Sequence, residues 1–334
     1  MPKVSVVIPT YNRADSVTRA IDSVLTQTVD DVECIVVDDA STDDTQAVLE
    51  QYEDEQRVRT LLHEVNQGGN AARNTGLDAA EGEYVALLDS DDEWKPRKLE
   101  RQLERLENED EDWVAAYCDW EYQLGDASGS VKRRIADLLA TLDDGDYPTE
   151  GGKEVLVEEI LADRLHTGAG STLIVKTDVA REVDGFDEEL DRFQDTEFAL
   201  RVVMAGKLAH VREPLMIRHD TGSPSADTYK EANEHLLSKY GETVERLEAE
   251  GADIRGQRRL FVTKHYLSEG RPVQSLTHLA TATFGPRDFP GLLAAAARGA
   301  SQRKRGTAVT LGALALGTVV LAYTVTRGRG ENRA

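Results

Sequence analysis

Two acidic side chains separated by one residue, Asp89 and Asp91, directly follow the apolar run Tyr84–Leu88. Such a run is typical of a buried strand, and alternate residues of an extended segment point to the same side. Paired carboxylates supply the hard oxygen ligands that Mg²⁺ and Mn²⁺ prefer, commonly together with phosphate oxygens. The spacing therefore predicts a divalent-metal site at Asp89 and Asp91 that holds a diphosphate.

A second acidic pair, Asp38 and Asp39, follows the apolar run Glu33–Val37 in the same manner. One interpretation is recognition of a nucleoside, because a carboxylate accepts hydrogen bonds from an imide N–H or from ribose hydroxyls. The alternative is a turn that caps the next helix. The chain has neither GxGxxG after its first strand nor GxxxxGK[ST]. Dinucleotide redox chemistry and P-loop phosphoryl transfer therefore lose their usual phosphate cradle.

These acids need a scaffold, and strand and helix patterns alternate over the first two thirds of the chain. The expected strands are 4–8, 33–37, 58–62, 84–88, 114–118 and 171–175, and the expected helices are 14–27, 43–51, 70–80, 99–106 and 197–205. This alternation predicts an α/β fold with a mostly parallel, doubly wound sheet. Ligands of such sheets bind beyond the carboxyl ends of the strands. Thr10 and Tyr11 end the first strand at that same edge.

The remainder of the chain differs in pattern. From Tyr229 onward the apolar spacing is helical, so we expect an α/β domain at 1–228 and a helical appendage at 229–306. Residues 307–326 carry no charge and are flanked by arginines. At about 1.5 Å per residue this stretch just crosses a bilayer core of roughly 30 Å. We predict a membrane anchor at 307–326; the alternative is a buried or interfacial helix, because threonine and glycine make it only modestly hydrophobic.

The composition is strongly acidic, with 62 acidic against 39 basic residues and a formal charge of −23. The acids are dispersed and arginine outnumbers lysine, which suits a cytosol rich in salt, where repulsion is screened. We interpret this as a halophilic composition; the alternative is an ordinary acidic enzyme. Nothing supplies a broad basic face for nucleic acid. Cys34 and Cys118 lie in expected buried strands without a disulfide framework, which favours a reducing compartment.

Taken in order over residues 3 to about 203, several segments resemble the family 2 glycosyltransferases of the GT-A fold. They are Val4–Arg13, Val36–Asp43, Asn66–Gly69 with Ala72–Gly76, Leu88–Asp92, Asp184–Glu188, and Gln194 with Asp195. Each motif alone is modest, and the ordered set is specific. There are two mild departures, Asp184 where the family commonly has glycine and Gln194 where it commonly has glutamate.

The resemblance implies a donor site for a nucleotide sugar. Tyr11, Asp39 and Arg73 would hold the nucleoside, and Thr10 and Asp38 belong to the same donor-side motifs.

The resemblance also implies the catalytic groups. Asp89 and Asp91 would lie at the diphosphate, with Asp91 as the direct ligand of Mn²⁺ or Mg²⁺. Asp195 would be the general base that deprotonates the acceptor hydroxyl; its structural alternative is a helix N-cap. His219 follows a strand and is a candidate for the metal or the diphosphate, although a lone histidine is more often structural.

The sequence thus predicts an inverting, metal-dependent glycosyltransferase that uses a nucleotide-diphosphate sugar, UDP-linked by resemblance, and transfers a hexose or hexuronic acid. Its acidic composition and anchor resemble haloarchaeal enzymes that extend polyprenyl-phosphate-linked glycans for surface-layer protein N-glycosylation. The expected location is the cell membrane, with the catalytic domain facing the cytoplasm. The alternatives are an exopolysaccharide glycosyltransferase, a nucleotidyltransferase, and a non-catalytic module that binds nucleotide sugars.

Overall fold

The computed structural model describes residues 1–123, 147–168, 170–219, 224–282, 284–285 and 288–302. Two compact units are present. The first comprises Met1–Gln123, Pro148–Ile160 and Leu165–Gly222, and the second comprises Leu124–Tyr147, Leu161–Arg164 and Ser223–Ala334. All of the motifs singled out above lie in the first unit.

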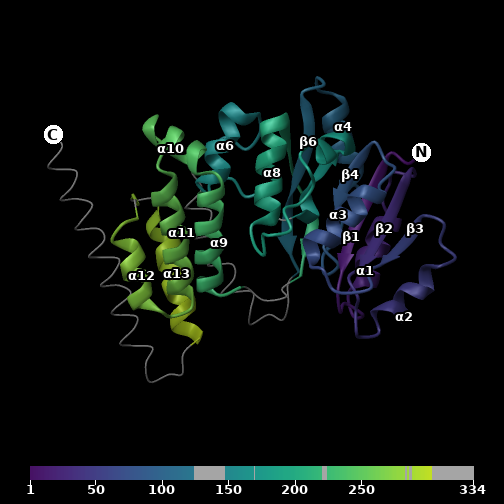
Figure 1. The fold of residues 1–334 in the computed structure, drawn as a ribbon, viewed down its shortest axis with the longest axis horizontal. Coiled ribbons are helices and arrows are strands. Elements are labelled where there is room, and N and C mark those ends of the chain that lie inside the picture. The colour runs from purple at the N-terminus through teal and green to yellow at the C-terminus, as the bar shows by residue number, and fades with distance from the viewer. Residues whose placement is uncertain (124–146, 169, 220–223, 283, 286–287, 303–334) are drawn as a thin grey trace. The chain divides into compact units, whose positions relative to one another are not determined.

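The first unit is built on a mixed sheet (Figure 1). Within the described residues it has eight strands in the order β3-β2-β1-β4-β7-β6-β8-β5. Strand β1 pairs in parallel with both β2 and β4, whereas β7 and β5 are antiparallel to their neighbours. The prediction of an α/β fold is therefore confirmed, and the sheet is mixed. The strands are β1 (Val4–Thr10), β2 (Val32–Asp38), β3 (Val58–Leu62), β4 (Tyr84–Leu87), β5 (Glu93–Trp94), β6 (Trp113–Tyr122), β7 (Ile174–Lys176) and β8 (Lys207–Arg218).

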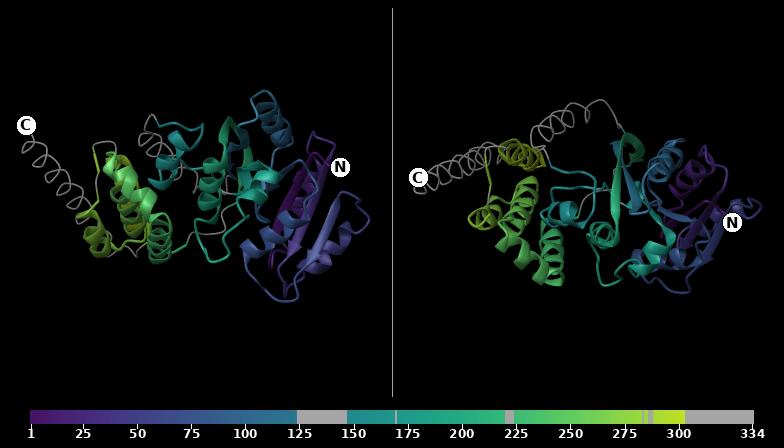
Figure 2. Two further views of the ribbon diagram at one scale, coloured as in Figure 1. Left: turned by 45° about the horizontal axis from the view of Figure 1, so that its top comes forward. Right: turned by 90° about the horizontal axis from the view of Figure 1, so that it is seen from above.

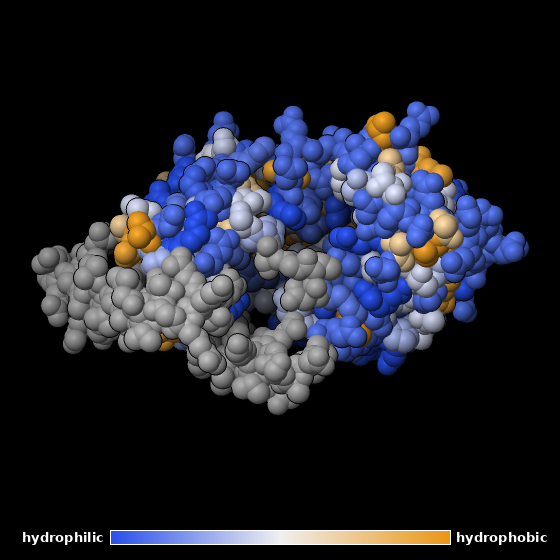
Figure 3. Space-filling model, turned by 90° about the horizontal axis from the view of Figure 1, so that it is seen from below, coloured by the Kyte–Doolittle hydropathy of each residue, from blue (hydrophilic) through white to orange (hydrophobic). Residues whose placement is uncertain are grey.

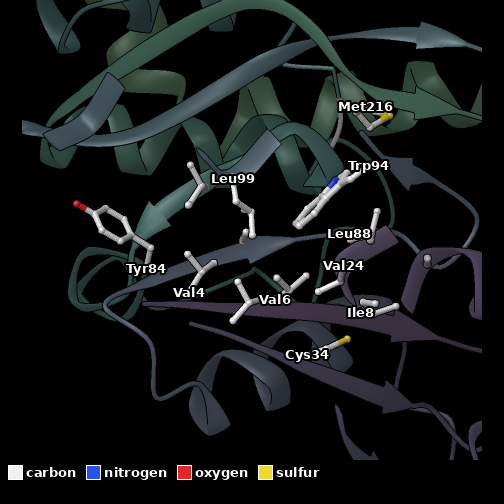
Figure 4. Packing of buried hydrophobic residues seen from close by; sticks show 14 of the residues in the cluster. Val4, Val6, Ile8, Val24, Cys34, Tyr84, Leu88, Trp94, Leu99 and Met216 are labelled. Carbon is white, nitrogen blue, oxygen red and sulfur yellow. The ribbon is translucent and has the colours of Figure 1, made fainter. Parts of the chain in front are cut away.

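Helices cover both faces of this sheet. Successive side chains of β1 point to opposite faces, and apolar residues on each face pack against these helices. Val6 belongs to a core cluster that also contains Val24 of α1 and Leu99 of α4, and Figure 4 shows these side chains packed together. Val7 points the other way, toward Gly76 of α3. The helical segments of this unit are α1 (Val17–Leu25), α2 (Thr45–Leu49), η1 (Glu50–Tyr52), α3 (Gly69–Ala79), α4 (Lys98–Glu107), α6 (Lys153–Leu161), η2 (Gly170–Thr172), α7 (Thr177–Glu182) and α8 (Gln194–Ala205).

Gly76 is where α3 approaches β1 most tightly. A Cβ atom at this position would lie 2.2 Å from Cγ1 of the fully buried Val7. We expect Gly76→Ala to push α3 off the sheet and to lower the free energy of unfolding by about 1–3 kcal/mol, measured by urea titration. Gly241→Ala is the matched control, because a Cβ there would meet nothing within 4 Å. Equal stability of Gly76→Ala and the wild type would contradict this packing.

The second unit is helical, as expected for the C-terminal part of the chain. Its helices are α9 (Ala226–Lys239), α10 (Gly241–Ala249), α11 (Ile254–Ser268), α12 (Pro272–Leu279) and α13 (Phe289–Gln302). Helix α11 packs against α9, α12 and α13 (Figure 2). No helix in the described ranges is both long enough and apolar enough to cross a membrane. The anchor predicted at 307–326 lies outside the described residues.

Both cysteines are free and fully buried, as their strand positions predicted. Burial raises the pKa of the Cys118 thiol to about 11, so it stays protonated at neutral pH. On the face drawn in Figure 3, hydrophilic residues predominate among the coloured atoms, in keeping with the high content of charged residues.

Candidate active site

The loops that follow β1 and β2 are tied together at the carboxyl edge of the sheet. Asn12 Oδ1 accepts hydrogen bonds from the backbone N–H of Thr42 (2.8 Å) and of Asp43 (3.3 Å). The Arg13 backbone N–H donates to Thr45 Oγ1 at 2.8 Å. Asn12 has a φ of 52°, a left-handed conformation that asparagine tolerates better than most residues. Two segments about 30 positions apart in sequence thus form one platform.

The two acids at the end of β2 have different surroundings. Asp38 is fully buried, and its carboxylate accepts hydrogen bonds from Ser41 and from Gln46 Nε2 (3.0 Å). These partners are those of a turn, so Asp38 shapes the loop that leads into α2. This geometry matches the turn alternative stated above for the acidic pair. The side chain of Asp38 is fully buried and is not exposed to a nucleotide sugar.

Asp39 holds the glycine-rich turn before α3. Its carboxylate accepts hydrogen bonds from the backbone N–H groups of Gln67 and Gly68, both at 2.8 Å, and His63 Nδ1 lies 2.7 Å from Oδ1. Gly68 has a φ of 97°, which explains the glycine at this position. These three partners take up most of the acceptor capacity of the carboxylate, and the side chain is only 3% exposed.

Thr10 and Tyr11 lie beside this platform. Tyr11 is 43% exposed, so its phenol ring is available to stack on a base. Thr10 is buried, and its Oγ1 has no hydrogen-bond partner in the described part of the chain. A buried hydroxyl without a partner is costly and marks a position where a ligand or water atom is expected.

A buried cation links the donor side of the site to the predicted base. Arg73 of α3 is 7% exposed and donates from Nη2 to Asp89 Oδ1 at 2.7 Å. Burial acts to lower the pKa of Arg73, but the negative charges of Asp89, Asp195 and Asp91 outweigh it, so the pKa is raised. The guanidinium therefore stays charged and neutralises part of an otherwise repulsive acidic cluster.

The acid loop, residues 89–92, carries the predicted metal ligands. Asp91 is 19% exposed at its side chain, and Arg13 Nη2 lies a loose 3.6 Å from its Oδ2. Arg19 of α1 donates to the Asp91 backbone carbonyl at 2.8 Å and so fixes the loop from below. Asp92 points inward, where burial and the neighbouring charge of Asp89 raise its pKa to about 7. Asp91 is thus more loosely paired than Asp89, whose carboxylate is more exposed (28%) but lies 2.7 Å from Arg73 Nη2.

These residues fit a hard divalent cation by their chemistry. The described residues contain no preassembled group of three or more histidine, cysteine or acidic side chains that could hold a metal. Mg²⁺ and Mn²⁺ are commonly bound through one or two carboxylates, with phosphate oxygens and water completing the shell. His219 lies beside the acid loop, with its backbone N–H 3.4 Å from Asp92 Oδ1 and its Nε2 3.3 Å from Glu93 Oε2.

Two asparagines of α3 clamp the segment 184–190, a feature that the sequence analysis did not single out. Asn70 Nδ2 donates to the carbonyls of Asp187 (2.8 Å) and Leu190 (2.7 Å). Asn74 accepts from the Phe186 N–H at 2.7 Å and donates to the Phe186 carbonyl at 2.9 Å. Asn70, Arg73 and Asn74 are three and four positions apart, which places them near one face of the helix. This spacing could have been recognised in the sequence.

The conformation of this segment explains why the family commonly has glycine at position 184, and aspartate tolerates that conformation better than most residues. Asp184 has a φ of 64°, in the left-handed region that glycine occupies without strain. Phe186 stacks on Phe198 of α8, with ring centroids 4.4 Å apart, and the Arg73 guanidinium lies 5.5 Å from its ring. Phe186 therefore contributes to packing at the base of the site.

Asp195 stands in the first turn of α8. Its Oδ1 is buried and has no hydrogen-bond partner among the described residues, although Asp195 as a whole is only partly buried. A Cβ on Gly170 would lie 3.0 Å from this oxygen. The absence of a side chain at Gly170 therefore makes space for the Asp195 carboxylate. Burial raises the pKa of Asp195, opposed by Arg73 and reinforced by Asp89. A carboxylate with a raised pKa is a stronger proton acceptor than an ordinary aspartate.

The comparisons with known proteins agree with this arrangement. Residues 5–134 match the model of glycosyl transferase family 2. The amylovoran biosynthesis glycosyltransferase AmsB of Erwinia amylovora is 30% identical over 250 residues, which cover 71% of each chain. The putative teichuronic acid biosynthesis glycosyltransferase TuaG of Bacillus subtilis is 49% identical over 104 residues. That match covers 31% of this chain and only 41% of the length of TuaG.

Two solved structures share the fold. S. aureus TarS 1–349, crystallised with UDP-GlcNAc, has a TM-score of 0.57 at 18% identity, covering 99% of this chain and 92% of that one. The mannosyltransferase PcManGT of Pyrobaculum calidifontis, in complex with GDP-Man and Mn²⁺, has a TM-score of 0.54 at 19% identity, covering 97% and 86%. The family model, the length of the AmsB match and the GT-A-like fold together establish that this chain belongs to glycosyl transferase family 2.

Proposed function

We propose that this protein is an inverting glycosyltransferase that moves a hexose or hexuronic acid from a nucleotide-diphosphate sugar to a hydroxyl of a glycan. One observation carries the proposal. The Asp195 carboxylate, with an unpartnered buried oxygen and a raised pKa, belongs to the same charge cluster as Arg73 and Asp89. The cluster thereby combines a proton acceptor, Asp195, with two groups proposed to lie at the donor diphosphate, Arg73 and Asp89.

Donor recognition falls to the platform formed by the loops after β1 and β2. Tyr11 stacks on the base, Thr10 Oγ1 and Asp39 bond the nucleoside, and Asp38 keeps the loop in shape. The UDP-GlcNAc complex of TarS supports UDP as the nucleotide, whereas the GDP-Man complex of PcManGT keeps GDP as the second choice.

The reaction is a single displacement. Asp195 takes the proton of the acceptor hydroxyl while that oxygen forms a bond to the anomeric carbon. The bond from the anomeric carbon to the diphosphate oxygen breaks on the opposite side, which inverts the configuration and releases the nucleoside diphosphate. Arg73 offsets negative charge at this end of the cluster. A bound Mn²⁺ or Mg²⁺, held by Asp91 with Asp89 and with His219 as a further candidate, would neutralise charge on the leaving diphosphate.

The acceptor is proposed to be a glycan assembled at the cytoplasmic face of the cell membrane. The names of AmsB and TuaG, both biosynthetic enzymes of polysaccharides, support a surface polysaccharide. The acidic composition and the proposed anchor at 307–326 favour a polyprenyl-phosphate-linked oligosaccharide for surface-layer glycosylation. One assay with separate acceptors distinguishes the two possibilities.

The test is release of nucleoside diphosphate from a panel of UDP-, GDP- and dTDP-sugars in molar KCl, with and without Mn²⁺ or Mg²⁺. Membranes, purified lipid-linked oligosaccharide and soluble polysaccharide serve as separate acceptors. We expect one donor to be turned over, only with the metal, and only with a lipid-linked or polysaccharide acceptor. Absence of turnover with every donor, in protein shown to be folded, would leave a nucleotide-sugar-binding module as the explanation. Release of pyrophosphate from a nucleoside triphosphate and a sugar phosphate would instead indicate a nucleotidyltransferase.

A further inference from the structure

The acid loop is fixed by a residue that lies far from it in the sequence. Ser171, in the short helix η2, is fully buried. Its Oγ accepts a hydrogen bond from the Asp89 backbone N–H at 3.0 Å and donates one to Asp92 Oδ2 at 2.6 Å. Its backbone carbonyl accepts a third bond from Trp94 Nε1 at 2.7 Å. One residue therefore holds the start, the end and the following strand of the loop.

The same short helix also borders the proposed base. Gly170, directly before Ser171, is the residue on which a Cβ would come within 3.0 Å of Asp195 Oδ1. The segment 170–172 thus touches the acid loop with one residue and packs against Asp195 with the previous one. The segment 170–172 therefore contacts both the acid loop and Asp195.

Two buried polar side chains of α4 anchor the segment in turn. Gln102 Nε2 donates to the Thr172 carbonyl at 2.8 Å, and its Oε1 accepts from Lys98 Nζ at 2.8 Å. Lys98 Nζ also lies 3.9 Å from the centre of the Trp94 ring. Lys98 and Gln102 are both fully buried. This network joins α4, the acid loop and η2 without any exposed member, so its positions are held by packing as well as by hydrogen bonds.

We propose that Ser171 is a positioning residue for the transfer reaction, which fixes the acid loop at the spacing from Asp195 that the donor diphosphate and the acceptor hydroxyl require. The inference rests on the proposed function for its chemistry, but the geometric role stands on the contacts alone. Ser171 is fully buried, so its role is to act through the acid loop and not by contact with a substrate. Its hydroxyl satisfies two polar groups of the loop at once, and an alanine would leave both of them without that partner.

The first test measures the loop directly. In Ser171→Ala, amide hydrogen exchange of a peptide covering residues 89–94 should rise on the order of tenfold, because the Asp89 N–H loses its acceptor. Ser23→Ala is the matched control, since Ser23 is a buried serine whose hydroxyl donates within its own helix, to the Ala20 carbonyl at 2.8 Å. Unchanged exchange in this peptide would overturn the proposal. If Ser171→Ala accelerates exchange throughout the chain, Ser171→Thr, which keeps the hydroxyl, should restore wild-type exchange at 89–94. Failure to do so would also overturn it.

The second test measures the consequence for binding and turnover. Ser171→Ala should weaken the binding of Mn²⁺ in the presence of UDP, measured by calorimetry, by about tenfold and should lower kcat by about 10- to 100-fold. The KM for the acceptor should change little. An equal loss in Ser171→Ala and Ser23→Ala would reduce Ser171 to a merely structural role. A wild-type protein that turns over no donor would count against the proposed function, whereas an active wild type with an equally active Ser171→Ala would count against the positioning role alone.

Discussion

Replacing Asp195 by asparagine should remove turnover almost completely while leaving donor binding intact. The amide is nearly isosteric but does not accept the proton of the acceptor hydroxyl, and general-base catalysis contributes about 10²- to 10⁴-fold. Release of nucleoside diphosphate should therefore fall by that factor, whereas the affinity for the donor, measured by calorimetry, should stay within about twofold. Asp191→Asn, at an exposed acid four positions earlier, is the control.

The pH dependence gives a second readout of the same group. Burial raises the pKa of Asp195 above its ordinary value of 3.8. Because the base must be ionised to act, kcat/KM should fall as the pH drops through that raised pKa, at a higher pH than an ordinary aspartate would give. The residual activity of Asp195→Asn should lack this acidic limb. Wild-type activity in Asp195→Asn would show that another group removes the proton.

The second large effect is expected at Asp91. Asp91→Asn keeps the size of the side chain but removes the negative charge of a carboxylate that has only a loose partner, Arg13 at 3.6 Å. Metal assistance is worth several kcal/mol of charge stabilisation, so kcat/KM for the donor should fall on the order of 100-fold or more. The concentration of Mn²⁺ needed for half-maximal activity should also rise.

Stability separates this effect from unfolding. The partner of Asp91, Arg13, is substantially exposed and 3.6 Å away, so the pair contributes little to stability. The unfolding midpoint of Asp91→Asn should match that of Asp54→Asn, an exposed acid on a surface turn. Full activity of Asp91→Asn at low metal concentration would show that Asp91 is not a ligand of the catalytic metal.

Much of the fold could be read from local pattern. The first four strands and the helices between them were predicted within a few residues, because continuous apolar runs and helical spacing are strong signals in buried parallel strands. Strand β8 was given no bounds, since its sequence mixes apolar, charged and proline residues and its pairing with β6 shifts register. Strand β5 has only two residues, which is too short for any periodicity.

The sequence predicts those site residues that directly follow a strand. It does not predict those whose position depends on contacts between distant parts of the chain. Asp89 and Asp91 directly follow β4, so their position is a property of local sequence. Ser171 carries no comparable signal, because its partners are 77 to 82 positions away. The expected strand 171–175 begins instead with the turn of η2, and this difference is what turns the hydroxyl of Ser171 toward the acid loop.

The clamp that Asn70 and Asn74 place on the segment 184–190 bears on protein engineering. Acceptor preference in such enzymes invites loop grafting, in which this segment is exchanged for that of a relative. Here the segment's backbone is bonded at several points to side chains of α3, the helix that also carries Arg73. A grafted loop with a different backbone path would pull on that helix and disturb the donor site. A workable chimera therefore has to exchange α3 and the loop as one piece.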